Sequence, residues 1–311
     1  MDNSTLVVRA QMPSRRRWAG DTLGPGPWLV LPAVLFFAAF VLWPLILTVI
    51  QSFYELSVTS RTRTWIGLDN YRRMAADPVF WLALRNNVII LAGSVLVQVG
   101  LGTILAALLD RAVRHGSTFF RTVIFAPMVM SVVAVSLLWS MIYHPIFGIV
   151  AKAVQALGLS LSSLGILGDP ATVIFAVLGV SCWQYTGFIM VIILAGMQSI
   201  PEELYQAARL DGARGVKAFI HITLPGIRNV LIVATLITMI GAFKVFDLIY
   251  VLTGGGPGNA SQVLGTLIYV NAFGLGRMGY ASALAVVLLA IAVGLGLLQL
   301  RISRSNLRRM A

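Results

Sequence analysis

The chain has 311 residues, of which 58% are hydrophobic and only 11% charged, and its formal net charge is +12. This composition excludes an ordinary soluble domain and is typical of a protein embedded in lipid. The single cysteine excludes an internal disulfide, and the three histidines do not have the spacing of metal ligands. The sequence has no G-x4-G-K-[ST] motif and no serine with a plausible base and acid around it. We therefore expect no catalytic residue, no metal and no cofactor bound by this chain.

Long uncharged segments are the main structural signal. A bilayer span needs roughly 20 mostly apolar residues. Five uncharged runs reach that length, at 22–54, 86–109, 122–151, 170–201 and 278–300. A sixth run, at about 227–252, is interrupted by Lys244 and Asp247. We predict an all-α integral membrane protein with one six-span domain at 28–303, between a basic tail at 1–27 and a second basic tail at 304–311.

The basic residues are distributed as the positive-inside rule expects, which favours a membrane protein over one that binds nucleic acid. With a cytoplasmic N-terminus, the inside segments carry fifteen Lys or Arg residues and the outside segments carry seven. Four arginines between positions 61 and 73 oppose this orientation locally. The total predicts that both chain ends face the cytoplasm, with lipid around the spans and no nucleic-acid partner.

Residues 199–225 form the one long polar segment between two apolar runs, and we call them the 199–225 stretch. Ser199-Ile-Pro-Glu202 has the spacing of a capping box, with Ser199 as the N-cap and Pro201 at an early helical position. This helix should end at Asp211-Gly212, since glycine permits a left-handed backbone. A second short helix is predicted from apolar residues at helical spacing, namely Val216, Phe219 and Ile220. On pattern alone, an amphipathic helix at the membrane surface is the alternative.

The same stretch carries a family resemblance. Gln206-Ala-Ala208, Gly212, Ile222 and Leu224-Pro225 occur at the spacing EAA-x3-G-x9-I-x-LP, which resembles the signature of importer-type ABC transporter permeases. Gln206 stands where that family usually has Glu, so this chain has an amide and not a carboxylate at that position. The resemblance implies a coupling helix that contacts an ATP-hydrolysing subunit. The implied contact residues are Glu203, Gln206, Ala207, Ala208, Asp211, Gly212, Ala213, Phe219, Leu224 and Pro225.

A second resemblance points to carbohydrate import. The segment 246–257, FDLIYVLTGGGP, is similar to F-D-x-[IV]-[YW]-x-[LM]-T-x-G-G-P of maltose-permease-like members of permease pairs, and 65–71, WIGLDNY, is similar to another segment of sugar permeases. The likeness implies a sugar site lined by Gln184, Tyr185, Phe188, Thr238, Gly241, Ala242 and Val245. Aromatic rings beside hydrogen-bonding groups suit a sugar, although helix packing is the more common role of each single ring.

Two further features, in and just after the apolar run at about 227–252, leave alternatives open. Lys244 and Asp247 are three residues apart, so we expect them to share a helix face, either as a local ion pair or in direct contact with the sugar. The glycines at 254–258 cannot continue a helix, which predicts a re-entrant turn, a lid or a plain loop.

The resemblance implies a protein of the bacterial cytoplasmic membrane that moves a sugar by alternating access. The implied partners are a second homologous permease, two copies of an ABC ATPase that bind ATP and Mg²⁺, and an extracytoplasmic sugar-binding protein. A polyol or a glycerol-phosphate ester stays open as the substrate. An ion-coupled secondary carrier is the runner-up, although only Asp247 within the spans could serve as a carboxylate relay.

Overall fold

The computed structural model describes residues 26–56, 63–112, 116–158 and 164–307, so most of the first basic tail and half of the second lie outside the described residues. The chain divides into two units, 1–47 and 48–311. In the first unit, α1 (Gly26–Phe37) and the π-helical segment η1 (Ala38–Leu42) lead directly into α2 (Trp43–Gln51), whose last four residues belong to the second unit. The helix Leu29–Gln51 is long and apolar enough to cross a membrane, as the sequence predicts for the first span.

Three long helices of the second unit also match predicted spans. The second span is a continuous helix, Pro78–Asp110, and begins eight residues earlier than predicted. Its parts are α4 (Pro78–Ser94), η2 (Val95–Val99), α5 (Gly100–Ala107) and η3 (Leu108–Ala112). The other two are α10 (Val173–Gln198) and α17 (Met278–Leu307). Four described helices could therefore each cross a membrane, and the number rises to six if each of two bent pairs is one span.

The third predicted span is not one helix. It consists of α6 (Ser117–Val129) and α7 (Val132–Ile142), which are bent by 100° with respect to each other. Pro127 lies in the last turn of α6, where it lacks an N–H to donate. Met130 and Ser131 then adopt extended backbone, and the Ser131 hydroxyl accepts the N–H of Ala134 at 3.4 Å, which starts α7. The last residues of the predicted span belong to a separate short helix, α8 (Ile149–Ala156). A further short helix, α9 (Gly165–Gly168), follows it.

The span predicted at about 227–252, which is the fifth in chain order, is also interrupted. Helix α14 (Arg228–Phe243) ends at Lys244, and α15 (Phe246–Leu252) begins after Val245. The prediction that Lys244 and Asp247 share a helix face is therefore wrong, because Lys244 lies in the turn after α14 and Asp247 lies in α15. Among the described residues the ion pairs include none between these two side chains.

Helix α10 is the centre of the second unit. Its buried side chains belong to two apolar clusters, one with Val177 and Val180 and one with Met190 and Ile193. At Gly187, α10 contacts α6 so closely that a Cβ atom would lie 2.0 Å from the carbonyl oxygen of Ile124. Small residues at such crossings let helix backbones approach each other within a membrane.

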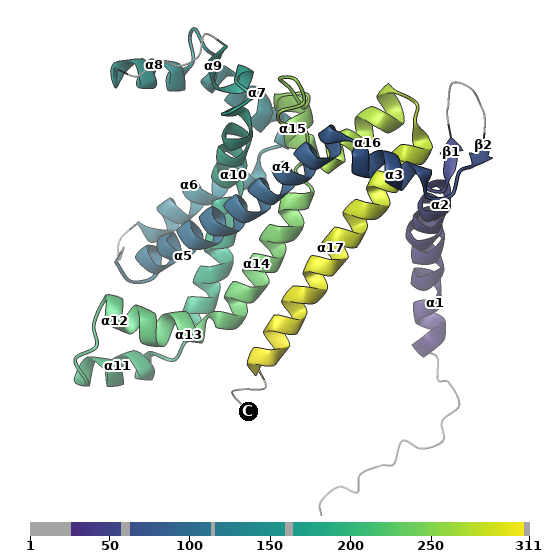
Figure 1. The fold of residues 1–311 in the computed structure, drawn as a ribbon. Helices are drawn as coiled ribbons and strands as arrows, with labels where there is room; N and C mark the ends of the chain where they lie inside the picture. Colours follow the sequence, from purple (N-terminus) through teal and green to yellow (C-terminus); the bar gives the residue numbers. More distant parts are fainter. Residues whose placement is uncertain (1–25, 57–62, 113–115, 159–163, 308–311) are drawn as a thin grey trace, which may run out of the picture. The chain divides into compact units, whose positions relative to one another are not determined.

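The two ends of the second unit carry different short elements (Figure 1). One end carries α11 to α13, which are the helices of the 199–225 stretch. The other carries the antiparallel strands β1 (Tyr54–Leu56) and β2 (Arg63–Trp65), with Tyr54 opposite Trp65, and the helices α3 (Asp69–Ala76) and α16 (Leu264–Tyr269). The π-helical segment η5 (Val270–Gly274) follows α16.

The glycine run after α15 forms a defined loop. Gly254 and Gly255 have φ of 60° and 87°, so the backbone uses the left-handed region that glycine permits. The side-chain amide of Asn86 on α4 donates to the carbonyl oxygens of Ala260 and Gln262, both at 2.8 Å. The carbonyl oxygen of the Asn87 side chain accepts the N–H of Leu264 at 2.8 Å. Two neighbouring asparagines of the second span thus hold the loop in place.

Candidate functional site

The 199–225 stretch contains two helical segments joined by a glycine turn. The first is α11 (Glu202–Leu210), with Glu202 and Glu203 in its first turn, where carboxylates interact favourably with the helix dipole. The second is continuous through α12 (Val216–Ala218), η4 (Phe219–Thr223) and α13 (Leu224–Gly226). The chain then bends by 70° into α14. The two short helices predicted from the sequence are present, and the second extends past Pro225.

The predicted capping box is wrong. Ser199 has helical backbone angles and ends α10, and its hydroxyl donates back to the carbonyl oxygen of Gly196 at 2.7 Å. Pro201 is the N-cap of α11, and no side chain caps that helix. Ser199 therefore belongs to the end of the preceding helix, and the next helix begins only after Pro201.

The turn at Gly212 is built as the sequence predicts. Gly212 has φ of 74°, its N–H donates to the Arg209 carbonyl at 3.2 Å, and the Ala213 N–H donates to the Ala208 carbonyl at 2.8 Å. These two bonds make a Schellman motif, which satisfies carbonyl groups at the end of α11. A Cβ at position 212 would have no atom within 4 Å. The backbone conformation, not crowding, is the reason for glycine here.

A buried hydrogen bond joins the two helical segments. The hydroxyl groups of Tyr205 on α11 and Thr223 on η4 lie 2.9 Å apart, and the two residues are only 2% and 3% exposed. Ala208, one turn after Tyr205, is buried as well. Phe219 packs against the apolar cluster that contains Ile193. The stretch is thus attached to the rest of the second unit through one face.

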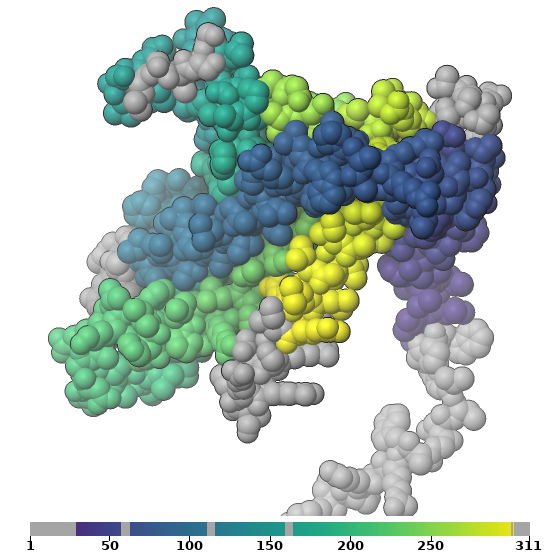
Figure 2. All heavy atoms as spheres, in the orientation of Figure 1, coloured from purple at the N-terminus to yellow at the C-terminus, as the bar shows by residue number. Residues whose placement is uncertain are grey.

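The opposite face of the stretch is open. Two large apolar side chains are strongly exposed there, Leu210 at 90% and Val216 at 72%. Of the residues implied as ATPase contacts, Glu203, Gln206, Ala207, Asp211, Gly212, Leu224 and Pro225 are exposed, Ala213 and Phe219 are half-buried, and Ala208 is buried. In the view of Figure 2, no other described element covers α11 and α12. Behind this face lies a groove of about 390 Å³ between the stretch and the end of the second span, lined by Leu108, Tyr205 and Phe219 among others.

A second cavity, which we call the central cavity, lies where the two broken helices meet α10. It measures about 220 Å³. Eight of the nine predicted substrate residues line it: Tyr185, Phe188, Thr238, Gly241, Ala242, Lys244, Val245 and Asp247. The structure thus brings together residues from α10, α14 and the start of α15. Their contact with a sugar stays a prediction.

Gln184 is the exception, because it does not line the central cavity. Its side chain is 1% exposed, and its amide nitrogen donates to the carbonyl oxygen of Met130 at 3.3 Å. Met130 lies at the break between α6 and α7, so Gln184 satisfies a carbonyl group that the broken helix leaves free. The expectation that Gln184 faces the same space as Tyr185 is wrong for this structure, since neighbouring residues on a helix point in different directions.

The cavity wall also contains residues that the sequence reasoning missed. They are Gln98, Met128, Val132, Ser181, Ile189, Ile237 and Leu248. Gln98 is only 4% exposed and lies in the middle of the second span. A polar residue inside a span is a signal for a functional site, and Gln98 could have been found in that way. Met128 and Val132 face the cavity because the helix breaks between them. No local sequence pattern predicts this break.

The chemistry of the central cavity is mixed. Lys244 and Asp247 lie at its exposed side, Thr238 and Gln98 are buried in its wall, and the rings of Tyr185 and Phe188 complete it. Hydroxyl, amide and charged groups beside aromatic rings can bind a ligand with apolar faces and hydroxylated edges. Among the described residues no group of three or more His, Cys, Asp or Glu side chains could hold a metal ion.

Comparison with known proteins identifies the class. The profile of the family described as binding-protein-dependent transport system inner membrane component matches residues 98–308. The chain therefore belongs to this family of ABC importer permeases. It is 45% identical, over 90% of its length and 96% of the relative, to a probable ABC transporter permease protein, YurN, of Bacillus subtilis. It is 31% identical, over 90% and 93%, to the trehalose/maltose transport system permease protein MalF of Thermococcus litoralis.

A solved structure shows the same fold. It is that of a bacterial alginate ABC transporter in complex with an alginate pentasaccharide-bound periplasmic protein. The TM-score is 0.78 at 23% identity, and the alignment covers 90% of this chain and 93% of that one. The predicted fold class, an all-α membrane permease of the ABC importer type, is confirmed.

Proposed function

We propose that this chain is the permease subunit of an ATP-driven importer that moves a mono- or oligosaccharide across the cytoplasmic membrane by alternating access. The observation that carries the proposal is the 199–225 stretch, which has the signature spacing, a rigid glycine turn and an exposed face with unpaired apolar side chains. Exposed apolar groups of this size mark contact surfaces. In this proposal the exposed face binds an ATPase subunit, which holds ATP and Mg²⁺.

The sugar would pass through the central cavity. At about 220 Å³ it is smaller than the range of roughly 300–1,000 Å³ that is usual for small-molecule sites. We therefore propose that the cavity is half of a pathway, completed by a second homologous permease, with two ATPase copies on the cytoplasmic side and an extracytoplasmic sugar-binding protein on the other. The name of the trehalose/maltose relative supports a sugar as the substrate. A polyol or glycerol-phosphate ester fits the same hydrogen-bonding groups.

The broken helices suit such a mechanism. Both breaks, at 130–131 and at 244–245, border the central cavity. A segment between two helix ends can change its backbone angles while the helices stay intact. We propose that these breaks move when ATP binding shifts the 199–225 stretch.

An ion-coupled carrier is the second candidate, and one observation favours it. Asp247 and Lys244 are both exposed at the central cavity and form no ion pair with each other among the described residues. A carrier driven by proton movement needs such a titratable carboxylate.

The whole complex, copurified and reconstituted in liposomes, decides between the two. A sugar of the right class should raise ATP hydrolysis in the presence of the binding protein, and uptake should require ATP inside the liposomes. Uptake by the single chain in response to a proton gradient, without nucleotide, would favour the carrier.

A further inference from the structure

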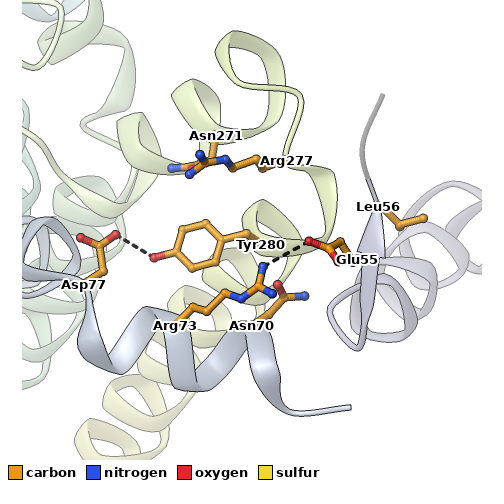
Figure 3. Close-up of a pocket in the computed structure, with 8 residues that line it drawn as sticks. All are labelled: Glu55, Leu56, Asn70, Arg73, Asp77, Asn271, Arg277 and Tyr280. Carbon is orange, nitrogen blue, oxygen red and sulfur yellow. Dashed lines mark hydrogen bonds and ion pairs between the residues drawn. The ribbon is translucent and has the colours of Figure 1, made fainter. Parts of the chain in front are cut away.

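A third cavity, which we call the charged cavity, lies at the end of the second unit that carries β1 and α3. It measures about 480 Å³, within the usual range of roughly 300–1,000 Å³ for small-molecule sites. Figure 3 shows its wall, which combines Glu55 of β1, Arg73 of α3, Asp77 at the start of α4, Asn271 of η5 and two residues near the start of α17, Arg277 and Tyr280. Neither the central cavity nor the 199–225 stretch contributes to it.

One side of the charged cavity offers free donors. The backbone N–H of Arg277 donates to the carbonyl oxygen of Asn271 at 2.8 Å, which fixes the position of the residue. Its guanidinium forms no ion pair among the described residues. A guanidinium carries five N–H donors in a planar fork. Arg277 can therefore donate to a ligand in this cavity.

The other charged groups are held in place by their own bonds. Arg73 pairs with Asp69 at 2.7 Å and with Glu55 at 3.3 Å, and these carboxylates raise the pKa of the Arg73 guanidinium, the hydrogen bond to Glu55 being the largest cause. Asp77 accepts the Tyr280 hydroxyl at 2.9 Å and the Val79 N–H at 2.8 Å. A carboxylate has about four acceptor positions. Glu55 and Asp77 thus keep acceptor capacity after these bonds.

The charges of the wall decide which ligand fits. Two guanidinium groups, Arg73 and Arg277, face two carboxylates, Glu55 and Asp77, so the formal charges cancel. An anion would be repelled by the two carboxylates, and a cation would be repelled by the two guanidinium groups. In each case this repulsion offsets the electrostatic attraction to the oppositely charged pair. Hydroxyl groups donate and accept at once, so a chain or ring of hydroxyls can use both kinds of partner. In Figure 3 the Tyr280 ring lies between the Arg277 and Arg73 side chains, where it can contact an apolar sugar face.

We propose that the charged cavity is a second binding site, for a neutral polyhydroxylated ligand of one or two sugar rings. The hydroxyl groups could come from a free sugar or from the exposed end of a sugar that a binding protein holds. The site is independent of the proposed transport role of the central cavity, so either can fail alone.

The test uses the complete complex in lipid nanodiscs, without binding protein, and saturation-transfer NMR with glucose, trehalose and lactose as probes. At least one sugar should bind. Arg277→Gln should weaken that binding at least tenfold, and Glu55→Gln should also weaken it. Arg72→Gln, which changes an exposed arginine of α3 outside the cavity, is the matched control and should bind as the unchanged protein does. Thr238→Trp, which fills the central cavity, should leave the Arg277-dependent part of the signal intact.

Two outcomes would overturn the proposal: no signal from any of the three sugars, or a signal that Thr238→Trp removes and Arg277→Gln leaves unchanged. A docking measurement with a purified binding protein shows whether the ligand is a free sugar or the exposed end of a sugar that the binding protein holds. If its sugar is the ligand, Arg277→Gln should weaken docking of the loaded form only. Equal weakening of the loaded and empty forms, with no free-sugar signal, would mean that the cavity contacts protein and not sugar.

Discussion

In the 199–225 stretch, a helix, a glycine turn and a second helix follow one another within 27 residues. The walls of the central cavity come instead from residues between Gln98 and Leu248, on six helical segments of the chain. The first region is stabilised by local backbone bonds and by one buried contact between Tyr205 and Thr223. The second exists only because two helices break beside α10.

This difference decides how each region responds to change. A turn such as that at Gly212 depends on one backbone conformation, so a single substitution can alter it without disturbing the spans. The central cavity depends on packing between helices, so a substitution at a crossing such as Gly187 changes its walls together. A substitution in the first region should abolish function while the fold stays intact. A substitution at a helix crossing in the second region should abolish function because it disrupts the fold.

The sharpest way to test this contrast is Gly212→Asp. Any residue with a Cβ at φ of 74° costs roughly 1 kcal/mol or more, and aspartate adds a charge to the exposed face. We expect sugar uptake to collapse while membrane insertion and docking of the binding protein survive. ATPase assays on the copurified complex should show detached subunits, or hydrolysis that no longer responds to sugar.

Gly212→Ala is the matched control, since it introduces the backbone strain without the charge and no atom lies within 4 Å of the new Cβ. Its defect should be the smaller of the two. Wild-type uptake by Gly212→Asp, with its ATPases bound, would show that the 199–225 stretch does not transmit the energy of hydrolysis.

The second test acts on the helix crossing. In Gly187→Leu the new Cβ would overlap the Ile124 carbonyl, which a Cβ at 187 would approach to 2.0 Å. Overpacking typically costs about 1–3 kcal/mol and here must move α6 relative to α10. We expect a lower unfolding temperature in detergent and loss of uptake together. Gly100→Leu, at a helical glycine with open space around it, should change neither.

The sequence predicts local features well and their assembly poorly. Gly212 could be recognised because a left-handed turn has a glycine signature, and the long apolar helices because composition defines them. The break at 130–131 could not, because Pro127 alone does not say whether a helix bends or ends. Ser199 was assigned to the wrong helix because its hydroxyl can bond to either neighbour. Gln98 has a signal of its own as a polar residue inside a span, but its place in the cavity wall depends on the packing of α10 against the second span.

A milder change tests the hydrogen bond that joins the two helical segments of the 199–225 stretch. Tyr205→Phe removes the hydroxyl that contacts Thr223 and leaves the buried Thr223 hydroxyl without that partner, a loss that typically costs about 1–3 kcal/mol. We expect ATP hydrolysis to continue with a weaker response to sugar, measured as the ratio of stimulated to basal rate. Adding Thr223→Val removes the other hydroxyl and should restore part of that ratio. No recovery in the double variant would mean that Tyr205 acts through another contact.

The smallest expected effect concerns Lys244 and Asp247. Because they form no ion pair in the structure, Lys244→Gln and Asp247→Asn should act independently. A double-mutant cycle on thermal stability should give a coupling energy below about 0.5 kcal/mol, as expected for residues without a shared interaction. A coupling well above that value would show that the two residues pair in another conformation of the transporter.

The bonds of Asn86 and Asn87 to the glycine loop have a consequence for biogenesis. Their partners in the chain lie 174 to 177 residues later. At a synthesis rate of about 5–20 residues per second, the loop leaves the ribosome about 10 to 35 s after the two asparagines. During that interval the two amides must bond to water or to the insertion machinery, since an unsatisfied amide in hydrocarbon costs several kcal/mol. We therefore expect the part of the second span that carries Asn86 and Asn87 to reach its final depth only when the glycine loop arrives.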